Sequence, residues 1–190
     1  MGVASENKPK ERRNRVGTIL IVLGVIFILT GAGIYVYKQL ENYFAIQENT
    51  RTVSLLTDAI SNTADTSDNL TIDGKEYVGI IELPSINLTL PVLASCENGN
   101  LERGICLYYS NGNYVIGGHN RVSQFRPIYN LRIGDKLVFY DTHSNKKEYK
   151  LVKTEILLPE NIKQFTTSEY GVTLFTCYWD NYQRYVLRFN

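Results

Sequence analysis

The sequence predicts a mainly β domain that follows one membrane-spanning helix. An uncharged run of 22 residues separates Arg15 from Lys38, which is long enough for such a helix. From about residue 75 onward, short apolar segments alternate with turn residues. The chain also contains 14 tyrosines, a residue type that favours strands over helices. Many short strands with turns between them indicate a β-sandwich or a β-barrel.

Composition excludes several classes of protein. The chain has 190 residues, of which 44% are hydrophobic, so it can bury a core. Its formal net charge is +1, whereas a protein that binds nucleic acid is usually strongly basic, so we expect no nucleic-acid partner. Three cysteines are too few for a disulfide-rich scaffold. Two histidines, His119 and His143, exclude a site built on three.

Residues 16–38 are expected to anchor the chain in a membrane. As an α-helix, the uncharged run would be about 33 Å long, against about 30 Å for a hydrocarbon core. Basic residues outnumber acidic ones before it: Lys8, Lys10, Arg12, Arg13 and Arg15 against Glu6 and Glu11. Because Lys and Arg stay on the cytoplasmic side, residues 1–15 should form a cytoplasmic tail, and the rest should lie outside the cell.

A cleaved signal peptide is the alternative interpretation of this segment. Its apolar part would be residues 18–30, with Gly31, Ala32 and Gly33 as the small-residue cleavage site. The apolar run continues to Tyr37, which favours the anchor. Both interpretations place residues 39–190 outside the cytoplasm.

Residues 39–74 are expected to form a stalk made of a helix and a linker. Apolar side chains at helical spacing predict a helix over residues 39–60, namely Leu40, Tyr43 and Phe44, then Val53, Leu56 and Ile60. Residues 61–74 are rich in Ser, Thr, Asn and Asp and end in Asp-Gly, a composition typical of a linker or turn. The folded domain therefore spans residues 75–190, without an internal repeat.

Strand signals fill residues 75–190. We expect strands at residues 77–82, 88–93, 114–116, 136–140, 148–158, 172–178 and 184–189. The segment 136–140 alternates most clearly, with Leu137 and Phe139 set against Val138 and Tyr140. Gly134-Asp135 precedes this strand, and the polar residues 143–147 form the next turn.

Cys177 is a candidate nucleophile because it ends the expected strand V-T-L-F-T-C. A cysteine at a strand end, next to a loop, is well placed to be reached by a substrate. Taken alone, however, a single cysteine in a β domain is more often a small buried hydrophobic residue.

His119 and Arg184 also lie at strand ends. His119 follows Gly117-Gly118, two residues without side chains that let the backbone turn sharply or admit a bulky neighbour. If the last two strands are antiparallel neighbours, Arg184 returns beside Cys177. Each residue also has an interpretation without a catalytic role. His119 could be a loop histidine with no function, and Arg184 could be an edge-strand arginine that only adds solubility. Arg188, on the same face as Arg184, is expected to be such an edge residue.

Together these segments resemble the sortases, membrane-anchored cysteine transpeptidases of Gram-positive bacteria with an eight-stranded β-barrel. The resemblance rests on G-H-N at 118–120, T-L-F-T-C at 173–177 and R-Y-V-L at 184–187, in the family's order. The turn L-R-I-G-D-K at 131–136 is similar to the L-x-x-G-D segment of many sortases. The similarity spans about residues 77–190 and assigns no sortase class.

The resemblance implies a role for each candidate. Cys177 would attack a peptide carbonyl and form a thioester, His119 would act as general acid and base, and Arg184 would hold the oxyanion or substrate carbonyl. The substrates would be secreted proteins with an LPxTG-like C-terminal sorting signal, cleaved between Thr and Gly. The acyl acceptor would be an amine of the peptidoglycan cross-bridge or a pilin lysine.

No cofactor is expected. Some class A sortases hold calcium, but Glu155, Glu160 and Glu169 are scattered in this sequence and fit ordinary solvated charge. Cys96 and Cys106, ten residues apart in one expected loop region, leave two alternatives open, a disulfide or two free half-buried thiols.

Two other functions compete with this interpretation. An L,D-transpeptidase would carry an S-x-G-C-x-R-like signature, which T-C-Y-W-D at 176–180 lacks. An anchored extracellular β-barrel that binds wall or surface components without catalysis would keep Cys177 buried and inert.

Overall fold

A computed structural model describes residues 10–62, 68–161, 164, 166, 169–179 and 182–190. The chain divides into two compact units within one long helix: one ends at Tyr43, and the other comprises residues 44–190. Residues 1–9 of the expected cytoplasmic tail, and residues 63–67 of the expected linker, lie outside the described residues.

The first unit is the N-terminal part of helix α1, which spans Lys10–Asn62 without a break. It contains an 18-residue stretch of mean hydropathy 2.7, so its length and composition make it a candidate membrane span. Its apolar side chains are exposed, for example Phe27 at 77% and Ile28 at 72%. The expected anchor, residues 16–38, and the expected helix over residues 39–60 both belong to α1.

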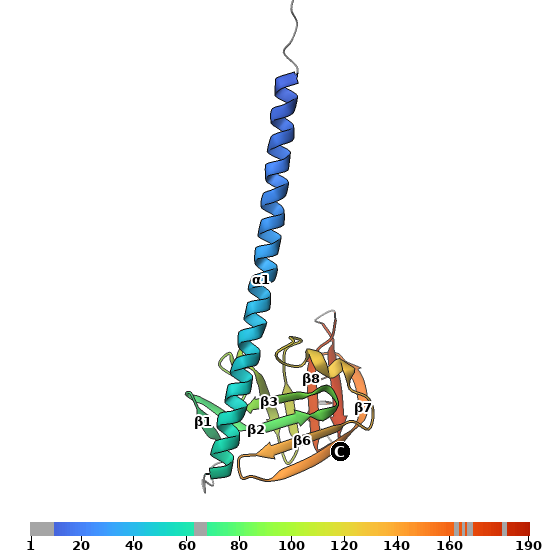
Figure 1. The fold of residues 1–190 in the computed structure, drawn as a ribbon. Helices are drawn as coiled ribbons and strands as arrows, with labels where there is room; N and C mark the ends of the chain where they lie inside the picture. Colours follow the sequence, from blue (N-terminus) through green and yellow to red (C-terminus); the bar gives the residue numbers. More distant parts are fainter. Residues whose placement is uncertain (1–9, 63–67, 162–163, 165, 167–168, 180–181) are drawn as a thin grey trace, which may run out of the picture. The chain divides into compact units, whose positions relative to one another are not determined.

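The second unit is a closed β-barrel (Figure 1). Its strands, within the described chain, are β1 Leu70–Ile72, β2 Lys75–Leu83, β3 Leu88–Leu93, β4 Ile105–Ser110, β5 Tyr114–Gly117, β6 Lys136–Asp141, β7 Lys146–Leu157, β8 Val172–Cys177 and β9 Arg184–Phe189. They pair in the order β1-β2-β3-β4-β5-β8-β9-β7-β6, and β6 also pairs with β2. This last pairing closes eight strands into a barrel and confirms the predicted fold class.

Closure between β2 and β6 depends on Gly79. Its backbone has a φ of +149°, and a Cβ there would lie 2.1 Å from the carbonyl oxygen of Tyr140 on β6. The register of β2 against β3 also shifts between Tyr77 and Gly79. A glycine is therefore required where β2 bends to meet both neighbours.

Two strands were not expected from the sequence. Residues 61–74 were predicted to be linker, but Leu70–Ile72 form β1, which pairs with the start of β2. Cys106 was placed in a loop, but it belongs to β4, which runs parallel to β3 and antiparallel to β5. Both segments are strands because adjacent strands supply their hydrogen bonds, which local sequence does not reveal. The other strands start and end within two residues of their predicted bounds.

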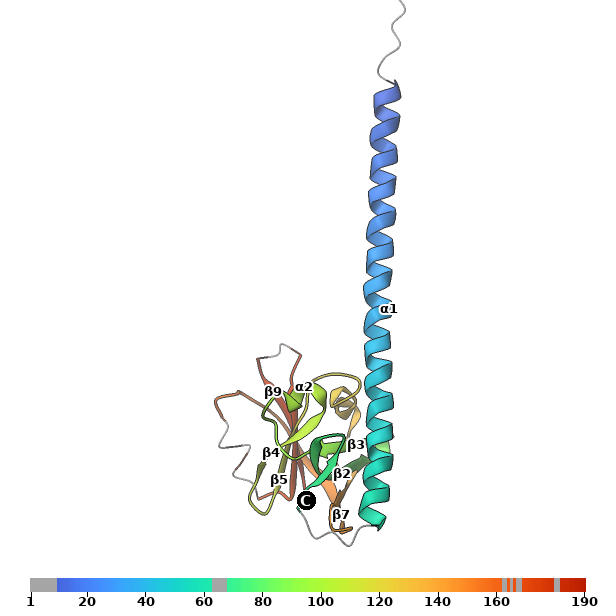
Figure 2. The ribbon, with the colours of Figure 1, turned by 90° about the vertical axis from the view of Figure 1, so that its left-hand side faces the viewer.

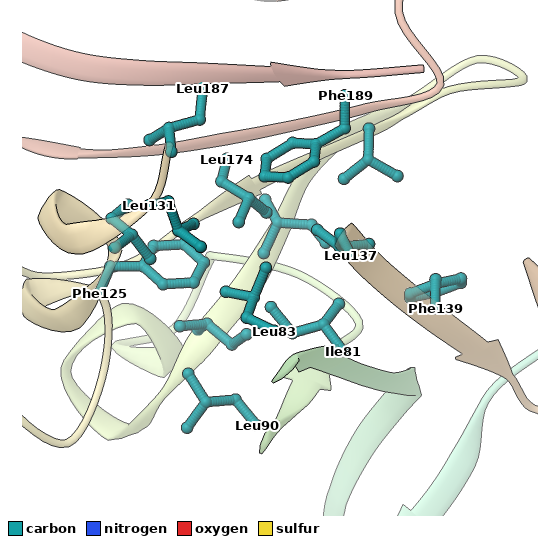
Figure 3. Packing of buried hydrophobic residues seen from close by; sticks show 14 of the residues in the cluster. Ile81, Leu83, Leu90, Phe125, Leu131, Leu137, Phe139, Leu174, Leu187 and Phe189 are labelled. Carbon is teal, nitrogen blue, oxygen red and sulfur yellow. The ribbon is translucent and has the colours of Figure 1, made fainter. Parts of the chain in front are cut away.

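The barrel interior is one apolar core (Figure 3). Inward-facing residues of nearly every strand contribute to it, and Phe125, Phe139 and Phe189 are its largest fully buried side chains. Phe125 comes from the loop after β5, just before the short helix η2, Arg126–Asn130. The core therefore also fixes the loop that carries His119.

The last turns of α1, in the second unit, pack on the barrel beside β2 and β3 (Figure 2). Leu56 is fully buried there against a cluster that includes Tyr77 and Leu93. Asn49 donates a hydrogen bond from Nδ2 to the carbonyl oxygen of Ser123 at 2.7 Å. Residues 44–62 are therefore a structural part of the barrel unit and also contact the loop after His119.

Candidate active site

A cavity of about 380 Å³ opens at one end of the barrel. Cys177, His119 and Arg184, the three residues singled out in the sequence, all line it. Most of its remaining wall is apolar, with Tyr108 and Phe175 among the lining side chains. The fold thus brings to one cavity three groups that lie up to 65 residues apart in sequence.

Cys177 is the last residue of β8, and its free thiol is half-buried. Strand alternation turns Leu174 into the barrel core, whereas Phe175 and Cys177 line the cavity. Cys177 is therefore reachable from the cavity rather than packed in the core. Thr176 also lines the cavity, and its buried Oγ1 has no hydrogen-bond partner among the described residues.

The backbone at Cys177 is held by an aromatic cluster. The Tyr129 hydroxyl donates a hydrogen bond to the carbonyl oxygen of Cys177 at 2.8 Å. The Tyr129 ring stacks on Tyr185 with centroids 4.7 Å apart, and on Trp179 at 5.2 Å. Burial, with smaller contributions from Tyr178, Tyr185 and Cys177, raises the pKa of Tyr129 to about 12, so at neutral pH its hydroxyl stays a donor.

Arg184 is the first residue of β9 and pairs directly with Cys177 on β8. The condition stated for the last two strands, that they are antiparallel neighbours, is therefore met, and Arg184 does return beside Cys177. Its guanidinium donates from Nη1 to the carbonyl oxygen of Gln183 at 3.2 Å. The β8–β9 connection begins at Tyr178, and its residues 180–181 lie outside the described chain.

The two glycines before His119 are required because neighbouring side chains leave no room for a Cβ, and not because their backbone has a positive φ. A Cβ at Gly117 would lie 2.8 Å from the Phe175 ring, and one at Gly118 would lie 2.6 Å from the Phe125 ring. Both distances are too short for a side chain, so the glycines let two aromatic rings approach the backbone. The bulky neighbours that the sequence suggested are these rings.

The imidazole of His119 contacts a carboxylate. Nε2 of His119 lies 2.8 Å from Oε1 of Glu102, which belongs to the one-turn helix α2, Asn100–Arg103. Arg121 Nη2 donates to the other carboxylate oxygen, Oε2, at 2.7 Å, and Arg121 Nη1 to the Glu102 carbonyl at 3.3 Å. The hydrogen bond from Arg121 lowers the pKa of Glu102, and His119 lowers it further.

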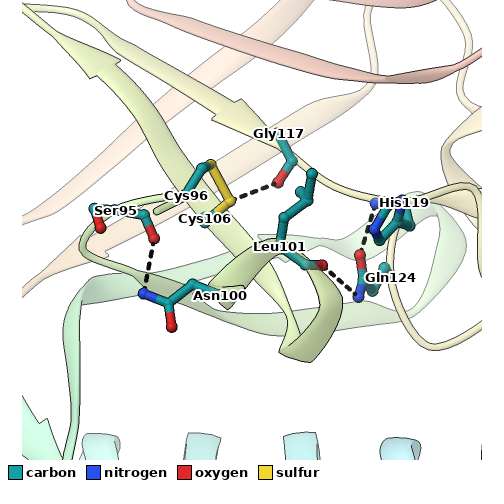
Figure 4. Close-up of a disulfide and its surroundings, with 8 residues drawn as sticks. All are labelled: Ser95, Cys96, Asn100, Leu101, Cys106, Gly117, His119 and Gln124. Atoms are coloured by element: carbon teal, nitrogen blue, oxygen red, sulfur yellow. Dashed lines mark hydrogen bonds between the residues drawn. A yellow bond between two sulfur atoms is a disulfide. The ribbon is translucent and has the colours of Figure 1, made fainter. Parts of the chain in front are cut away.

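The buried side chain of Gln124 joins the His119 loop to the α2 loop (Figure 4). Its Oε1 accepts a hydrogen bond from the His119 backbone N–H at 2.6 Å, and its Nε2 donates to the Leu101 carbonyl at 3.3 Å. The backbone at His119 is thus held independently of its ring.

Cys96 and Cys106 form a disulfide, which decides between the two alternatives left by the sequence. It closes the loop that carries α2 (Figure 4). Cys96 also lines the cavity. Sγ of the fully buried Cys106 lies 3.8 Å from the carbonyl oxygen of Gly117, two residues before His119. The disulfide therefore fixes the α2 loop next to the strand that leads to His119.

Arg188 is not the solubilising edge residue that the sequence suggested. It is 2% exposed, because β9 pairs with β8 on one side and β7 on the other. Its side chain donates to Glu155 Oε1 at 2.8 Å, to Thr173 Oγ1 at 3.0 Å and to the Gln164 carbonyl. Glu155 is likewise not an ordinary solvated charge, because it binds Arg188 and Lys153.

Several residues of the site carried no sequence signal. Glu102, Arg121, Gln124 and Tyr129 lie in short loops or one-turn helices, and their partners are up to 48 residues away. In the described part of the chain, no three His, Cys, Asp or Glu side chains gather as a metal site.

Three comparisons with known proteins agree. Residues 81–189 match the model of the Sortase domain. The chain is 35% identical over 132 residues to Sortase A of Bacillus anthracis and 30% identical over 122 residues to Sortase D of Bacillus subtilis (strain 168). These alignments cover 63% and 57% of this chain, and they span 61% of each relative.

Solved structures share the fold. Sortase C of Clostridium perfringens, solved with the C-terminal cell wall sorting motif, has a TM-score of 0.60 at 23% identity, and the match covers 74% of this chain and 97% of that one. Sortase A of Listeria monocytogenes has a TM-score of 0.54 at 26% identity, covering 60% and 87%.

Proposed function

Because the chain belongs to the sortase family, we propose that it is a membrane-anchored cysteine transpeptidase acting on C-terminal sorting signals. The observation that carries the proposal is that Cys177, His119 and Arg184 line one cavity. A nucleophile, a proton carrier and a fixed cation are the groups that acyl transfer through a thioester requires.

In the first half-reaction, the Cys177 thiolate attacks the carbonyl carbon of the scissile peptide bond, and a C–S bond forms. The carbonyl oxygen becomes an oxyanion. When the C–N bond breaks, the His119 imidazolium gives its proton to the departing amine, and the acyl group stays on Cys177 as a thioester.

In the second half-reaction, an acceptor amine attacks the thioester carbonyl. Neutral His119 takes the proton that the amine loses, the new C–N bond forms, and the C–S bond breaks. Cys177 leaves as the thiolate and His119 is again the imidazolium, so both groups return to their starting state.

Arg184 supplies the positive charge that the oxyanion needs in both halves. A guanidinium stays protonated, so its hydrogen bonding is available at any working pH. Its place opposite Cys177 supports this role, because the register of β8 and β9 sets the separation of the two residues. Fixed donors of this kind are stronger in a site shielded from water.

We infer that the substrate is a secreted protein with an LPxTG-like C-terminal signal, cut between Thr and Gly. The apolar wall of the cavity suits the Leu and Pro side chains of such a signal, and Leu101, Tyr108 and Phe175 contribute to it. The structure of sortase C from Clostridium perfringens with its sorting motif supports the same substrate class.

The acceptor and location complete the proposal. The acceptor is an amine of the peptidoglycan cross-bridge or a pilin lysine. Residues 16–38 of α1 cross the membrane, residues 1–15 are cytoplasmic, and the catalytic domain, residues 75–190, acts outside the cell. The basic residues before the apolar stretch support this orientation.

The test uses the full chain in detergent with a panel of LPxTG-type peptides and hydroxylamine. Mass spectrometry should detect a peptide hydroxamate with the wild type and none with Cys177→Ala. Because Cys96 and Cys106 are disulfide-bonded, iodoacetamide labelling of the unreduced protein reports Cys177 alone.

The outcomes are distinct. No hydroxamate together with an unlabelled Cys177 would overturn the transpeptidase and favour a β-barrel binding module. No hydroxamate with a reactive Cys177 would overturn the choice of sorting signal only.

A further inference from the structure

The contact between His119 and Glu102 constrains how the histidine can carry a proton. Glu102 Oε1 lies 2.8 Å from Nε2, and Arg121 occupies the second carboxylate oxygen at 2.7 Å. The lowered pKa of Glu102, due mainly to Arg121 and then to His119, keeps this carboxylate ionised at neutral pH. An ionised carboxylate only accepts hydrogen bonds, so Nε2 must carry a hydrogen in both states of the ring.

If Nε2 always carries a hydrogen, Nδ1 is the nitrogen that gains and loses the exchangeable proton. The arrangement is analogous to the acid–histidine pair of serine proteases, in which a carboxylate fixes the tautomer and orientation of the ring. Glu102 itself is outside the residues that line the cavity, so it is placed to act through His119 rather than on a substrate.

The element that carries Glu102 is held in place by covalent and polar links. The Cys96–Cys106 disulfide closes its loop, and the buried Gln124 ties the Leu101 carbonyl to the His119 backbone. Glu102 therefore approaches His119 from a fixed loop, although its own side chain is 62% exposed. Because exposed ion pairs add little to stability, this pairing has little structural purpose of its own.

We propose that Glu102 is a positioning residue for the transpeptidation reaction, whose carboxylate holds Nε2–H of His119 and thereby assigns proton transfer to Nδ1. This role rests on the proposed function of the cavity. Arg121 has a supporting role, because it fixes the carboxylate from the side opposite His119. Among the described residues that line the cavity with His119, the other ionisable groups are Cys177, Arg184 and Tyr108.

The first arm of the test measures steady-state hydroxamate formation by the full chain in detergent. Glu102→Ala should lower kcat about tenfold, part of the 10²–10⁴ that general acid–base catalysis contributes, with KM unchanged. Glu102→Gln keeps an acceptor oxygen and should fall between Ala and wild type. Glu97→Ala is the matched control, since Glu97 is an exposed carboxylate of the same disulfide-closed loop.

The second arm does not depend on activity. The chain contains two histidines, so ¹⁵N-histidine spectra of wild type and His143→Gln assign the ring signals of His119. At a pH where the ring is neutral, wild type should carry its hydrogen on Nε2, and Glu102→Ala should show a mixture of both tautomers. Glu97→Ala should match wild type.

Failure of the proposal and failure of the proposed function are distinguishable. A wild type without any product would overturn the proposed function, and the tautomer spectra would still decide the role of Glu102. Glu102 has no positioning role if wild type carries the hydrogen on Nδ1. The same holds if Glu102→Ala leaves both kcat and the tautomer ratio at the Glu97→Ala values.

Discussion

Cys177 and Arg184 are directly paired residues, one ending β8 and the other opening β9. The short connection between these strands returns the chain at the position where the guanidinium and the thiol face the same cavity. Their separation is set by the register of β8 against β9. In the proposed reaction, the oxyanion donor and the nucleophile are therefore positioned by the same pair of strands.

Replacing Arg184 should reduce the rate of acyl transfer. Loss of one oxyanion donor typically lowers kcat by about 10²–10³, and we expect that range for Arg184→Ala. Arg184→Lys should recover little, because an ammonium lacks the planar fork of a guanidinium. Initial rates of hydroxamate formation measure the effect. The exposed Arg126 gives the control Arg126→Ala, and equal rates for both alanine variants would contradict the role of Arg184.

Gly118→Ala should destabilise the barrel and displace His119. The added Cβ would lie 2.6 Å from the Phe125 ring and 2.8 Å from Ile105, both within the packed core. Overpacking of this kind costs about 1–3 kcal/mol. Urea unfolding should show this loss, whereas Gly104→Ala, whose Cβ would meet Leu93 at 3.5 Å, should stay close to wild type. Equal stability of the two variants would refute the close packing at Gly118.

Tyr129→Phe should cost about 0.5–1.5 kcal/mol of stability, because it removes the hydrogen bond to the Cys177 carbonyl but keeps the ring. Burial raises the pKa of Tyr129 from 10.0 to about 12, so the protonated hydroxyl is favoured in the folded state and stabilises it. The difference between wild type and variant should be complete below about pH 10 and shrink as the pH rises towards 12. Unfolding at pH 8 and pH 11 tests this, and Tyr109→Phe should show no such change.

Glu155→Gln should destabilise the protein by about 1.5–3 kcal/mol at pH 7, the range for hydrogen bonds to charged groups. Burial alone raises the pKa of Glu155, but Lys153 and Arg188 together outweigh it, so the pKa lies below the ordinary 4.5. A carboxylate with a lowered pKa stabilises the folded protein fully above pH 4.5, and this stabilisation is lost as the pH falls through the pKa of Glu155 in the folded state.

Denaturant titrations at pH 7 and pH 3 measure this pH dependence. The difference between wild type and Glu155→Gln should be smaller at pH 3. The exposed Glu160 provides the control Glu160→Gln, which should match wild type at both values. If the stability difference between wild type and Glu155→Gln were larger at pH 3 than at pH 7, the direction assigned to the Glu155 pKa shift would be wrong.

Removing the disulfide should affect both stability and the role of Glu102. Replacing Cys96 and Cys106 by serine should cost about 2–4 kcal/mol, as for other disulfides. The loop that carries Glu102 would then be less fixed, so Glu102→Ala should lower kcat by a smaller factor in this background. A double-mutant cycle on kcat measures the coupling, and strictly additive effects would show that the disulfide does not help to place Glu102.

Much of the fold could be predicted because its signals are local. Alternation such as Leu137–Val138–Phe139 depends on neighbouring residues only, and the strand bounds followed from turn residues between the apolar segments. β1 and β4 escaped prediction because their strand state depends on partners, β2 for the first, and β3 and β5 for the second.

The burial of Arg188 likewise could not be predicted from local sequence. Position in sequence places it on the face of Arg184, and this much was predicted. Its 2% exposure follows from closure of the barrel, which gives β9 a neighbour on each side and brings Glu155 to its guanidinium. No local pattern states which strand becomes an edge.

The sequence by itself determined the apolar helix, the mainly β domain and the three strand-end residues Cys177, His119 and Arg184. These depend on hydrophobic length, alternation and short motifs, which are properties of contiguous residues. Only the tertiary structure decided that the three share one cavity, that Glu102 contacts the ring of His119 while Arg121 binds the Glu102 carboxylate, and that Cys96 bonds Cys106. These contacts arise from strand register and barrel closure, which bring together residues that the linear order keeps apart.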